Sequence, residues 1–249
     1  MKNILLEITF NGSFYHGWQI QKNAITVQQV LKETIEKLTN EQIVLNGCSR
    51  TDAGVHANSF CCNFKTNSGI PSEKFADALN ANLPSDIVVK KSENVPLDFH
   101  SRYDCKGKRY IYKILNSKSK NPFKEKLVYY YPYSIDVDLL NEQASDFVGE
   151  YDFTSFCASG SEVESKVRRI YDFTVERKDD EVIFSVTGNG FLYNMVRIMV
   201  GTLLDINTGR IEKDTIKEII DKKSRKNAGI TVPGEGLYLD KVYYKEVLE

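Results

Sequence analysis

The residues best suited to chemistry lie at positions 47–57, where the chain runs Gly-Cys-Ser-Arg-Thr-Asp-Ala-Gly-Val-His-Ala. One cation, Arg50, and one anion, Asp52, stand two residues apart, and the small residues Ala53 and Gly54 follow at once. A guanidinium beside a carboxylate favours its ionised form, which suits nucleophilic or electrostatic catalysis. Glycine permits a tight turn, and a small neighbour leaves room for a ligand to approach the carboxylate.

An Arg-x-Asp triplet by itself more often marks a capped turn, with the arginine on the surface. The longer string changes this interpretation, because it closely resembles the Gly-Arg-Thr-Asp-Ala-Gly-Val-His-Ala signature of the TruA family of tRNA pseudouridine synthases. The resemblance implies that Asp52 is the catalytic residue. Ser49 replaces the family's usual glycine, and serine does not easily adopt a positive φ, so a slightly different loop geometry is expected.

Length and composition indicate a globular chain and give no sign of its partner. The 249 residues fit one large domain or two smaller ones, with 41% hydrophobic and 27% charged residues. Because the formal net charge is −1, an RNA-binding surface would have to come from local clusters of Lys and Arg. No stretch approaches the roughly 18 apolar residues of a membrane-spanning helix, so no membrane association is expected.

Cysteine and histidine usage predicts neither a metal site nor disulfides. The five cysteines form no pair at metal-ligand spacing, and an odd number cannot be fully bridged, so free thiols in a reducing cytoplasm are expected. The three histidines are scattered, and without a cluster of His, Cys and acidic residues we expect no metal. These cysteines and histidines are Cys48, Cys61, Cys62, Cys105, Cys157, His16, His56 and His100.

Hydrophobic periodicity predicts the elements that position the Asp52 loop. Apolar residues alternate over 4–10 as in a strand, and recur at helical spacing over 27–38. The expected elements of the first half are a strand at 4–10, a helix at 27–38, strands at 42–45 and 58–65, a helix at 72–81 and a strand at 87–89. This order, β-α-β-β-α-β, is that of the ferredoxin-like arrangement.

The second half shows a similar order. Its expected elements are strands at 109–115, 169–176, 182–187 and 236–244, and helices at 137–148, 191–206 and 212–223. The predicted fold class is therefore α+β, with two ferredoxin-like or RRM-like halves joining mainly antiparallel sheets around a central cleft. The halves are expected at 1–104, which carries the Asp52 loop, and 105–249, which completes the cleft and the RNA surface.

Two further segments resemble the family. Lys108-Arg109-Tyr110 matches its Arg-Tyr pair, which implies that Tyr110 stacks on the target base beside Asp52; a half-buried strand tyrosine is the structural alternative. Residues 188–197 read Gly-Asn-Gly-Phe-Leu-Tyr-Asn-Met-Val-Arg. Arg197 is a charge within a nearly apolar helix and therefore needs a carboxylate partner. The resemblance pairs this arginine with Asp52, so both Tyr110 and Arg197 are expected to bind substrate.

Basic residues gather around Tyr110. The stretch 102–126 is rich in Lys and Arg and contains aromatic residues, a combination that suits a surface following RNA phosphates. A solvated charged face is the alternative interpretation. Within this stretch, the residues expected to contact RNA are Lys106, Lys108 and Arg109.

The resemblance covers about residues 4–244 and implies a cytoplasmic isomerase without cofactor or metal, acting as a homodimer on tRNA. Its substrates would be uridines 38–40 of the anticodon stem-loop, where the N1–C1′ bond breaks and the uracil rejoins through C5. A flipped base must leave its stack, and Arg50 would fill the vacated space. Whether Asp52 attacks C1′, stabilises an oxocarbenium-like state or deprotonates the sugar stays open at this stage.

The sequence leaves other functional classes open. One is a paralogue with another RNA target, and another is a non-catalytic protein of two RRM-like units. The core motif of the RRM is absent from the chain. A small-molecule enzyme with an Asp or Cys nucleophile is the last alternative, although no Walker loop, nucleophile elbow or Cys-His constellation is visible.

Overall fold

The computed structural model describes residues 1–160, 163–245 and 247, and these divide into two compact units. Unit 1 holds Met1–Lys106 together with the chain from Tyr238 onward, and unit 2 holds Gly107–Leu237. The break after Lys106 lies close to the boundary expected near 104. The last strand, β10 (Leu237–Tyr243), was expected in the C-terminal half, but it pairs in parallel with a strand of unit 1, with Tyr238 opposite His56.

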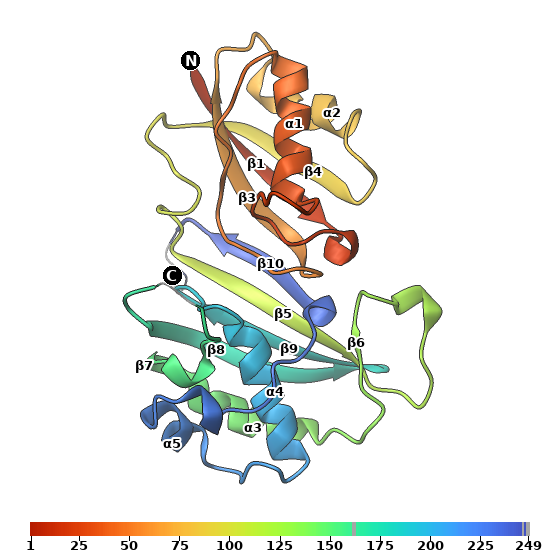
Figure 1. Cartoon of the computed structure of the whole chain (residues 1–249), viewed down its shortest axis with the longest axis vertical. Helices are drawn as coiled ribbons and strands as arrows, with labels where there is room; N and C mark the ends of the chain where they lie inside the picture. Colours follow the sequence, from red (N-terminus) through yellow and green to blue (C-terminus); the bar gives the residue numbers. More distant parts are fainter. Residues whose placement is uncertain (161–162, 246, 248–249) are drawn as a thin grey trace. The chain divides into compact units, whose positions relative to one another are not determined.

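In unit 1, two helices cover one face of an antiparallel sheet (Figure 1). The central strand β1 pairs with β3 on one side and β4 on the other. Its residues Ile4, Leu6 and Ile8 are fully buried, as are Leu31 and Ile35 of the first helix, so period-2 and period-3.6 faces meet in one core. The elements are β1 (Lys2–Phe10), α1 (Val27–Thr39), β2 (Asn46–Gly47), β3 (His56–Thr66), α2 (Phe75–Asn80) and β4 (Ile87–Val95).

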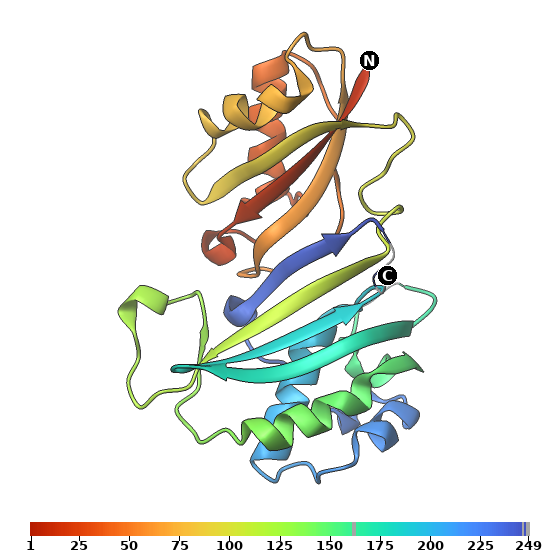
Figure 2. The ribbon, with the colours of Figure 1, turned by 180° about the vertical axis from the view of Figure 1, so that it is seen from behind.

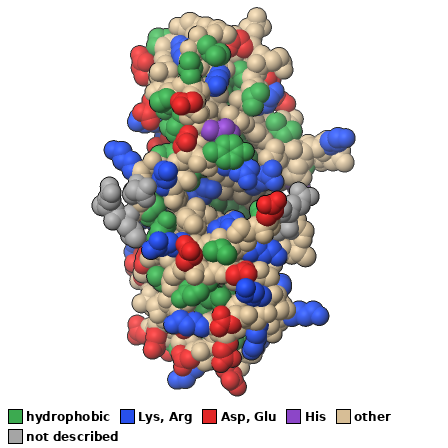
Figure 3. Space-filling model, turned by 90° about the vertical axis from the view of Figure 1, so that its left-hand side faces the viewer, with side chains coloured by type: hydrophobic (Ala, Val, Ile, Leu, Met, Phe, Trp, Pro, Cys, Tyr) green, Lys and Arg blue, Asp and Glu red, His purple; other side chains and the backbone are tan. Residues whose placement is uncertain are grey.

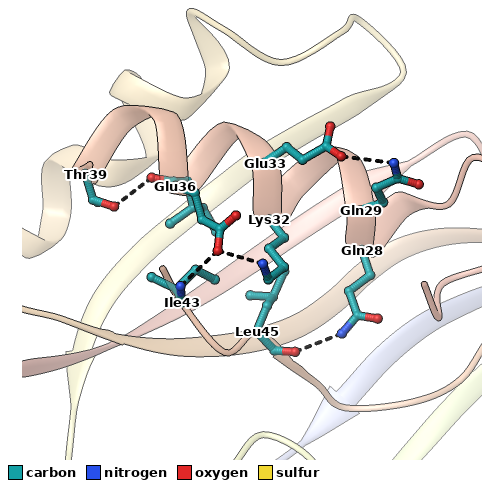
Figure 4. A network of polar contacts seen from close by, with 9 residues as sticks. Gln28, Gln29, Lys32, Glu33, Glu36, Thr39, Ile43 and Leu45 are labelled. Atoms are coloured by element: carbon teal, nitrogen blue, oxygen red, sulfur yellow. Dashed lines mark hydrogen bonds and ion pairs between the residues drawn. The ribbon is translucent and has the colours of Figure 1, made fainter. Parts of the chain in front are cut away.

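The prediction of a strand at 42–45 is wrong, because side chains of α1 bond to the backbone of this segment (Figure 4). The Glu36 carboxylate accepts a hydrogen bond from the backbone N–H of Ile43 at 3.0 Å, and the Gln28 amide donates to the carbonyl of Leu45 at 2.9 Å. Ile43 and Leu45 are buried while Val44 is exposed, which reproduces the alternation of a strand. The backbone groups at 43 and 45 are instead bonded to the helix, and the strand β2 is displaced to Asn46–Gly47.

The strands of unit 2 pair antiparallel in the order β5-β9-β8-β7, and β6 pairs in parallel with β5. Tyr110, Tyr112 and Ile114 of β5 lie on its buried face. The alternate residues of the same strand are half-buried, as in a sheet with one face in the core. The strands are β5 (Gly107–Leu115), β6 (Tyr129–Tyr130), β7 (Gly149–Asp152), β8 (Val167–Lys178) and β9 (Glu181–Gly188).

The helices of unit 2 are shorter than the sequence predicts. The helix expected at 191–206 starts only at Met195, because Asn194 has a left-handed backbone with φ 59°. The apolar run therefore begins in a turn, in which Leu192 is buried and Tyr193 is 48% exposed. Periodicity alone does not separate such a turn from the first turn of a helix. The helices are α3 (Val137–Ala144), α4 (Met195–Asn207) and α5 (Ile216–Asp221).

The mixed α+β class and the predominantly antiparallel pairing confirm the fold class predicted from the sequence. The division into ferredoxin-like halves stays a prediction. Lys and Arg side chains are interspersed with acidic ones on the face in Figure 3, in keeping with the near-zero net charge. Among the described residues, no helix is long and apolar enough to cross a membrane, and no three His, Cys, Asp or Glu residues cluster as metal ligands.

Glu36→Ala is expected to lower the free energy of unfolding by about 1.5–3 kcal/mol, since charge-assisted hydrogen bonds contribute on that scale. The variant loses the bonds to Ile43 and to Lys32, whose Nζ lies 2.6 Å from the Glu36 carboxylate. Glu33→Ala is the matched control, because Glu33 is exposed on the same helix and contacts Gln29. Its cost should stay below about 0.5 kcal/mol. Chemical denaturation at pH 7 measures both variants.

The Lys32–Glu36 ion pair predicts that the free energy of unfolding depends on pH. The hydrogen bond from Lys32 lowers the pKa of Glu36 below its ordinary value of 4.5. A depressed folded-state pKa adds stability that is present above 4.5 and is lost as the pH falls through the folded-state value. The difference between wild type and Glu36→Ala should therefore narrow in acid below pH 4.5. A difference that stays constant down to complete protonation would contradict the role given to this carboxylate.

Candidate active site

The Asp52 loop, residues 48–55, begins at the end of a short strand in unit 1. β2 pairs with β3 at Asn46–Asn63 and Gly47–Cys62. Cys48 then extends the pairing, since its N–H donates to the carbonyl of Cys61 at 2.8 Å. The chain leaves the sheet at Ser49 and returns at the start of β3. Both ends of the loop are thereby fixed to one strand.

The middle of the loop is held by the segment that follows β1. The N–H of Trp18 donates to the carbonyl of Thr51 at 3.2 Å, and the N–H of Gly54 donates to the carbonyl of Tyr15 at the same distance. Trp18 is 2% exposed and stacks on Phe60, with ring centroids 4.1 Å apart. The segment that contains Tyr15 and Trp18 therefore anchors the loop through packing and backbone bonds.

Two glycines allow this close fit. Gly17 has φ +80°, and a Cβ there would lie 2.2 Å from the carbonyl oxygen of Thr51. Gly54 has φ +75° at the turn, where the N–H of Val55 donates to the carbonyl of Asp52 at 3.2 Å. Other residues adopt a positive φ at a cost. The backbone of the loop is thus specified by glycine positions outside and inside it.

The side chains of the loop divide by exposure. Arg50 is exposed, Asp52 is half-buried, and Thr51 between them is buried. Among the described residues, Thr51 Oγ1 is the buried side-chain polar atom without a hydrogen-bond partner. An unsatisfied buried hydroxyl typically costs about 1–3 kcal/mol. The half-buried Asp52 carboxylate lies between the core and the surface, where a substrate can reach it.

His56 and Tyr238 support the loop, a task that was not predicted from the sequence for either residue. His56 opens β3 and is 1% exposed; its Nδ1 accepts a hydrogen bond from the N–H of Gly12 at 3.0 Å. Because Nδ1 is an acceptor, neutral His56 carries its proton on Nε2. Its ring stacks on Tyr238 of β10 with centroids 4.5 Å apart. The position of His56 within the signature string was the available signal for this role.

In unit 2, Tyr110 lies on the buried face of β5. It is 6% exposed, and the ring of Phe191 meets it edge-on at a centroid distance of 5.1 Å and an angle of 82°. Phe191 was expected in the core of a helix, but it lies in the turn before α4 and fixes the orientation of the tyrosine ring. The two segments of unit 2 that resemble the family are therefore in direct contact.

Arg197 lies in the first turn of α4 and is half-buried. Its Nε donates to the carbonyl of Val232 at 2.8 Å, and its Nη1 donates to Oδ1 of Asn194 at 2.7 Å. Asn194 thus performs two tasks, since its left-handed backbone starts the helix and its side chain holds the guanidinium. The sequence missed Asn194 and Val232 because both act through contacts that periodicity does not report.

The basic residues expected to bind RNA do not share one face. Lys106 is exposed in unit 1, and its N–H donates to the carbonyl of Tyr243 at 2.8 Å. Lys108 and Arg109 are half-buried in β5, and side chains of neighbouring strand residues point to opposite faces. Lys108 therefore lies on the side of Tyr110, and Arg109 on the other. Asp52 belongs to unit 1 and Tyr110 and Arg197 to unit 2, so their convergence on one substrate stays a prediction.

Comparison with known proteins identifies the class. A family model described as tRNA pseudouridine synthase matches residues 8–104 and 144–245. A tRNA pseudouridine synthase A of Clostridium acetobutylicum is 49% identical over 98% of this chain and 100% of its own length, and one of Acetivibrio thermocellus has the same values. A Clostridium perfringens protein named tRNA pseudouridine synthase A 2 is 45% identical over the same shares.

A solved structure titled "Crystal Structure of a Cbf5-Nop10-Gar1 Complex" is 13% identical and covers 79% of this chain and 52% of its own, with a TM-score of 0.32. A value this low has no weight for the fold. The family match and the full-length relatives do, and they agree with the loop and helix segments described above. The chain belongs to the tRNA pseudouridine synthase family, of the TruA type predicted from its sequence.

Asn194→Gly is expected to lower kcat for pseudouridine formation roughly 10- to 100-fold, and to lower the melting temperature only by what the loss of one hydrogen bond costs. Glycine keeps the left-handed backbone but removes the acceptor from Arg197, a hydrogen bond to a charged group of about 1.5–3 kcal/mol. Asn194→Ala should lose the same activity and also about 1–2 kcal/mol of stability, because alanine disfavours that backbone. Full kcat in both variants would show that Asn194 does not position Arg197.

Proposed function

We propose that this protein isomerises uridine to pseudouridine in the anticodon stem-loop of tRNA, at positions 38–40, with Asp52 as the catalytic residue. The observation that carries the proposal is the signature string at 47–57, folded as a glycine-fitted loop that leaves the Asp52 carboxylate half-buried. The family match includes this loop and the start of α4. Tyr110 lies between the two matched segments, so its role rests on the Arg-Tyr resemblance and on its contact with Phe191.

The reaction requires no oxidant, reductant or metal. The N1–C1′ bond of uridine breaks, the uracil turns, and a C5–C1′ bond forms; the proton of C5 departs and N1 gains one, so atoms and charge balance. Positive charge develops at C1′ when the first bond breaks. The Asp52 carboxylate opposes that charge, whether or not it forms a bond to C1′.

Three further side chains complete the proposed site. Arg197, held by Asn194 and Val232, pairs with the Asp52 carboxylate. Exposed Arg50 occupies the space that the flipped nucleotide leaves in the RNA. Tyr110 contacts the target base and presents its hydroxyl to C5. Lys108, on the side of Tyr110, neutralises a phosphate of this nucleotide, and Lys106 and Arg109 contact other phosphates of the RNA.

The protein is further proposed to act in the cytoplasm as a homodimer. All five cysteines are free thiols in the structure, which suits a reducing compartment. The tRNA substrate is found in the same compartment. Sedimentation of the purified protein tests the dimer, and a monomer that retains full activity would contradict it.

Asp52→Asn is expected to abolish pseudouridine formation while tRNA affinity stays within about twofold of wild type. The amide keeps the shape of the side chain but removes the charge that opposes the developing cation. Release of tritium from C5-labelled tRNA measures turnover, and filter binding measures affinity. Asp146→Asn, which changes a carboxylate of unit 2 paired with Lys217, is the control and should keep full activity. Turnover of Asp52→Asn within tenfold of wild type would remove Asp52 from catalysis.

Tyr110→Phe separates the two tasks given to this residue. The ring and its edge contact with Phe191 remain, so tRNA affinity should change little, whereas loss of the hydroxyl removes the proposed acceptor for the C5 proton. Single-turnover kinetics should show slow product formation on uridine. Rearrangement of 5-fluorouridine in tRNA, where no proton can leave C5, should proceed at the wild-type rate. Full activity on both substrates would leave Tyr110 with a packing role alone.

A further inference from the structure

Phe123 is an aromatic side chain in an unusual setting. It is 90% exposed, the highest value among the large hydrophobic residues that the structure describes as exposed. It lies in the arm, which we define as residues 116–128 between β5 and β6 of unit 2. Figures 1 and 2 show this segment as a loop projecting from the end of the strands. The family model leaves residues 105–143 unmatched, so the shared motifs assign this arm no task.

The base of the arm is firmly held. β6 pairs in parallel with β5 where the arm begins and returns, with Ile114 opposite Tyr129. The Asn116 amide donates to the carbonyls of Tyr131 and Tyr133, both at 2.8 Å, and its oxygen accepts from Arg177 at 2.9 Å. One side chain thus joins the two legs of the arm to the neighbouring strand β8.

The tip is also fixed. A 3-10 turn, Pro122–Lys124, carries Phe123, and Oδ1 of Asn121 accepts the N–H of Phe123 at 3.0 Å. Lys124 then forms ion pairs with Asp180 at 2.8 Å and Glu181 at 2.9 Å in the turn between β8 and β9. These two carboxylates raise the pKa of Lys124. The phenyl ring therefore projects from an ordered backbone, which reduces the entropy that binding would cost.

The arm that carries Phe123 contains four lysines and one acidic residue, Glu125. Lys118 and Lys120 are exposed on the same arm, and Lys120 lies over the ring of Tyr130, with its Nζ 5.7 Å from the centroid. The Tyr130 hydroxyl donates to the carbonyl of Lys118 at 3.0 Å, which fixes this side of the arm. An exposed aromatic ring in a segment with more lysines than acidic residues matches the pattern of single-stranded RNA contacts, where a base stacks and phosphates are neutralised.

We propose that the arm is a second RNA contact of this enzyme, in which Phe123 stacks on an unpaired base of the tRNA while Lys118 and Lys120 meet its phosphates. The inference rests on the proposed tRNA substrate. Five residues of β5 separate Tyr110 from the start of the arm after Leu115, which is roughly 17 Å at the rise of a strand. The stacked base is therefore a nucleotide other than the target uridine.

A protein partner fits these features less well. Interface cores are depleted in lysine and hold several apolar side chains together, whereas the arm offers one highly exposed ring, Phe123, in a segment rich in lysine. Lys124 is paired with Asp180 and Glu181. The remaining lysines of the arm, Lys118, Lys120 and Lys126, outnumber its acidic residue Glu125, so the arm keeps a net positive charge. Charge complementarity therefore favours RNA over a second copy of the chain.

The test compares variants of the full-length protein by binding to one unmodified tRNA transcript at fixed salt. Phe123→Ala is expected to weaken affinity about 5- to 100-fold, as stacking on one base is worth roughly 1–3 kcal/mol. Phe123→Tyr should bind as wild type, and Phe123→Leu, which is apolar without a π face, should fall close to Phe123→Ala. The kcat at saturating tRNA should remain within about twofold, because the arm touches no reacting atom. The double variant Lys118→Gln, Lys120→Gln should reduce the salt dependence by about the contribution of two phosphates.

Val44→Ala is the control, because Val44 is also an exposed apolar residue, 75% exposed in unit 1. Its affinity and the melting temperatures of all variants should match wild type. Unchanged affinity of Phe123→Ala would overturn the proposal, as would a loss that appears only because the oligomer dissociates in sedimentation. A wild-type protein that forms no pseudouridine would instead refute the proposed function, so the two failures are distinguishable.

Discussion

The backbone contact between residues 12–18 and the Asp52 loop is the constraint on which the site depends. The carbonyl of Thr51 accepts from Trp18, and Gly17 lies so close to it that no side chain fits between them. A second backbone bond joins Gly54 to Tyr15. Backbone bonds of this kind fix the direction in which a side chain leaves the loop. The position of Asp52 is therefore fixed by these backbone bonds and by the close packing at Gly17.

The same principle applies to unit 2, where the beginning of one helix orients Arg197 and Tyr110, the two residues of this unit that are proposed to bind substrate. The turn at Asn194 breaks the apolar pattern, starts α4 and holds the guanidinium of Arg197. Phe191, just before this turn, fixes the ring of Tyr110. Orientation by a held backbone also describes the arm, where Asn121 and Lys124 hold the turn that carries Phe123. Preorganised groups of this kind lose little freedom on binding.

The sequence predicted the class, the α+β architecture and most strands, because alternation over β1, β5 and β9 is strong and local. It failed where side chains of a helix bond to the backbone of an extended segment, and where a left-handed residue interrupts an apolar run. The extended segment at 42–45 looked like a strand because its buried and exposed residues alternate, but its backbone is bonded to Glu36 and Gln28. The start of α4 was misplaced because the left-handed backbone of Asn194 interrupts an apolar run that continues on both sides.

For the site, the motifs provided the candidate residues but not their supports. Asp52, Tyr110 and Arg197 could be named because the family strings contain them. The tasks of His56, Asn194 and the carbonyl of Val232 were not predicted. His56 and Val232 bond to residues far along the chain, and Asn194 acts through a left-handed backbone and a bond to the Arg197 side chain. The backbone bonds that join Tyr15 and Trp18 to the loop appear only in the folded chain.

The central claim is that the carboxylate of Asp52 acts at C1′ of a uridine that Tyr110 and Arg197 also contact. A crystal structure of Asp52→Asn bound to a substrate tRNA tests it most directly, because this variant should bind without turnover. The account predicts a flipped uridine whose C1′ lies about 3–3.5 Å from the side chain of residue 52, with Tyr110 against the base and Arg197 beside residue 52. A bound target uridine whose C1′ lies beyond reach of residue 52, or against another carboxylate, would contradict it.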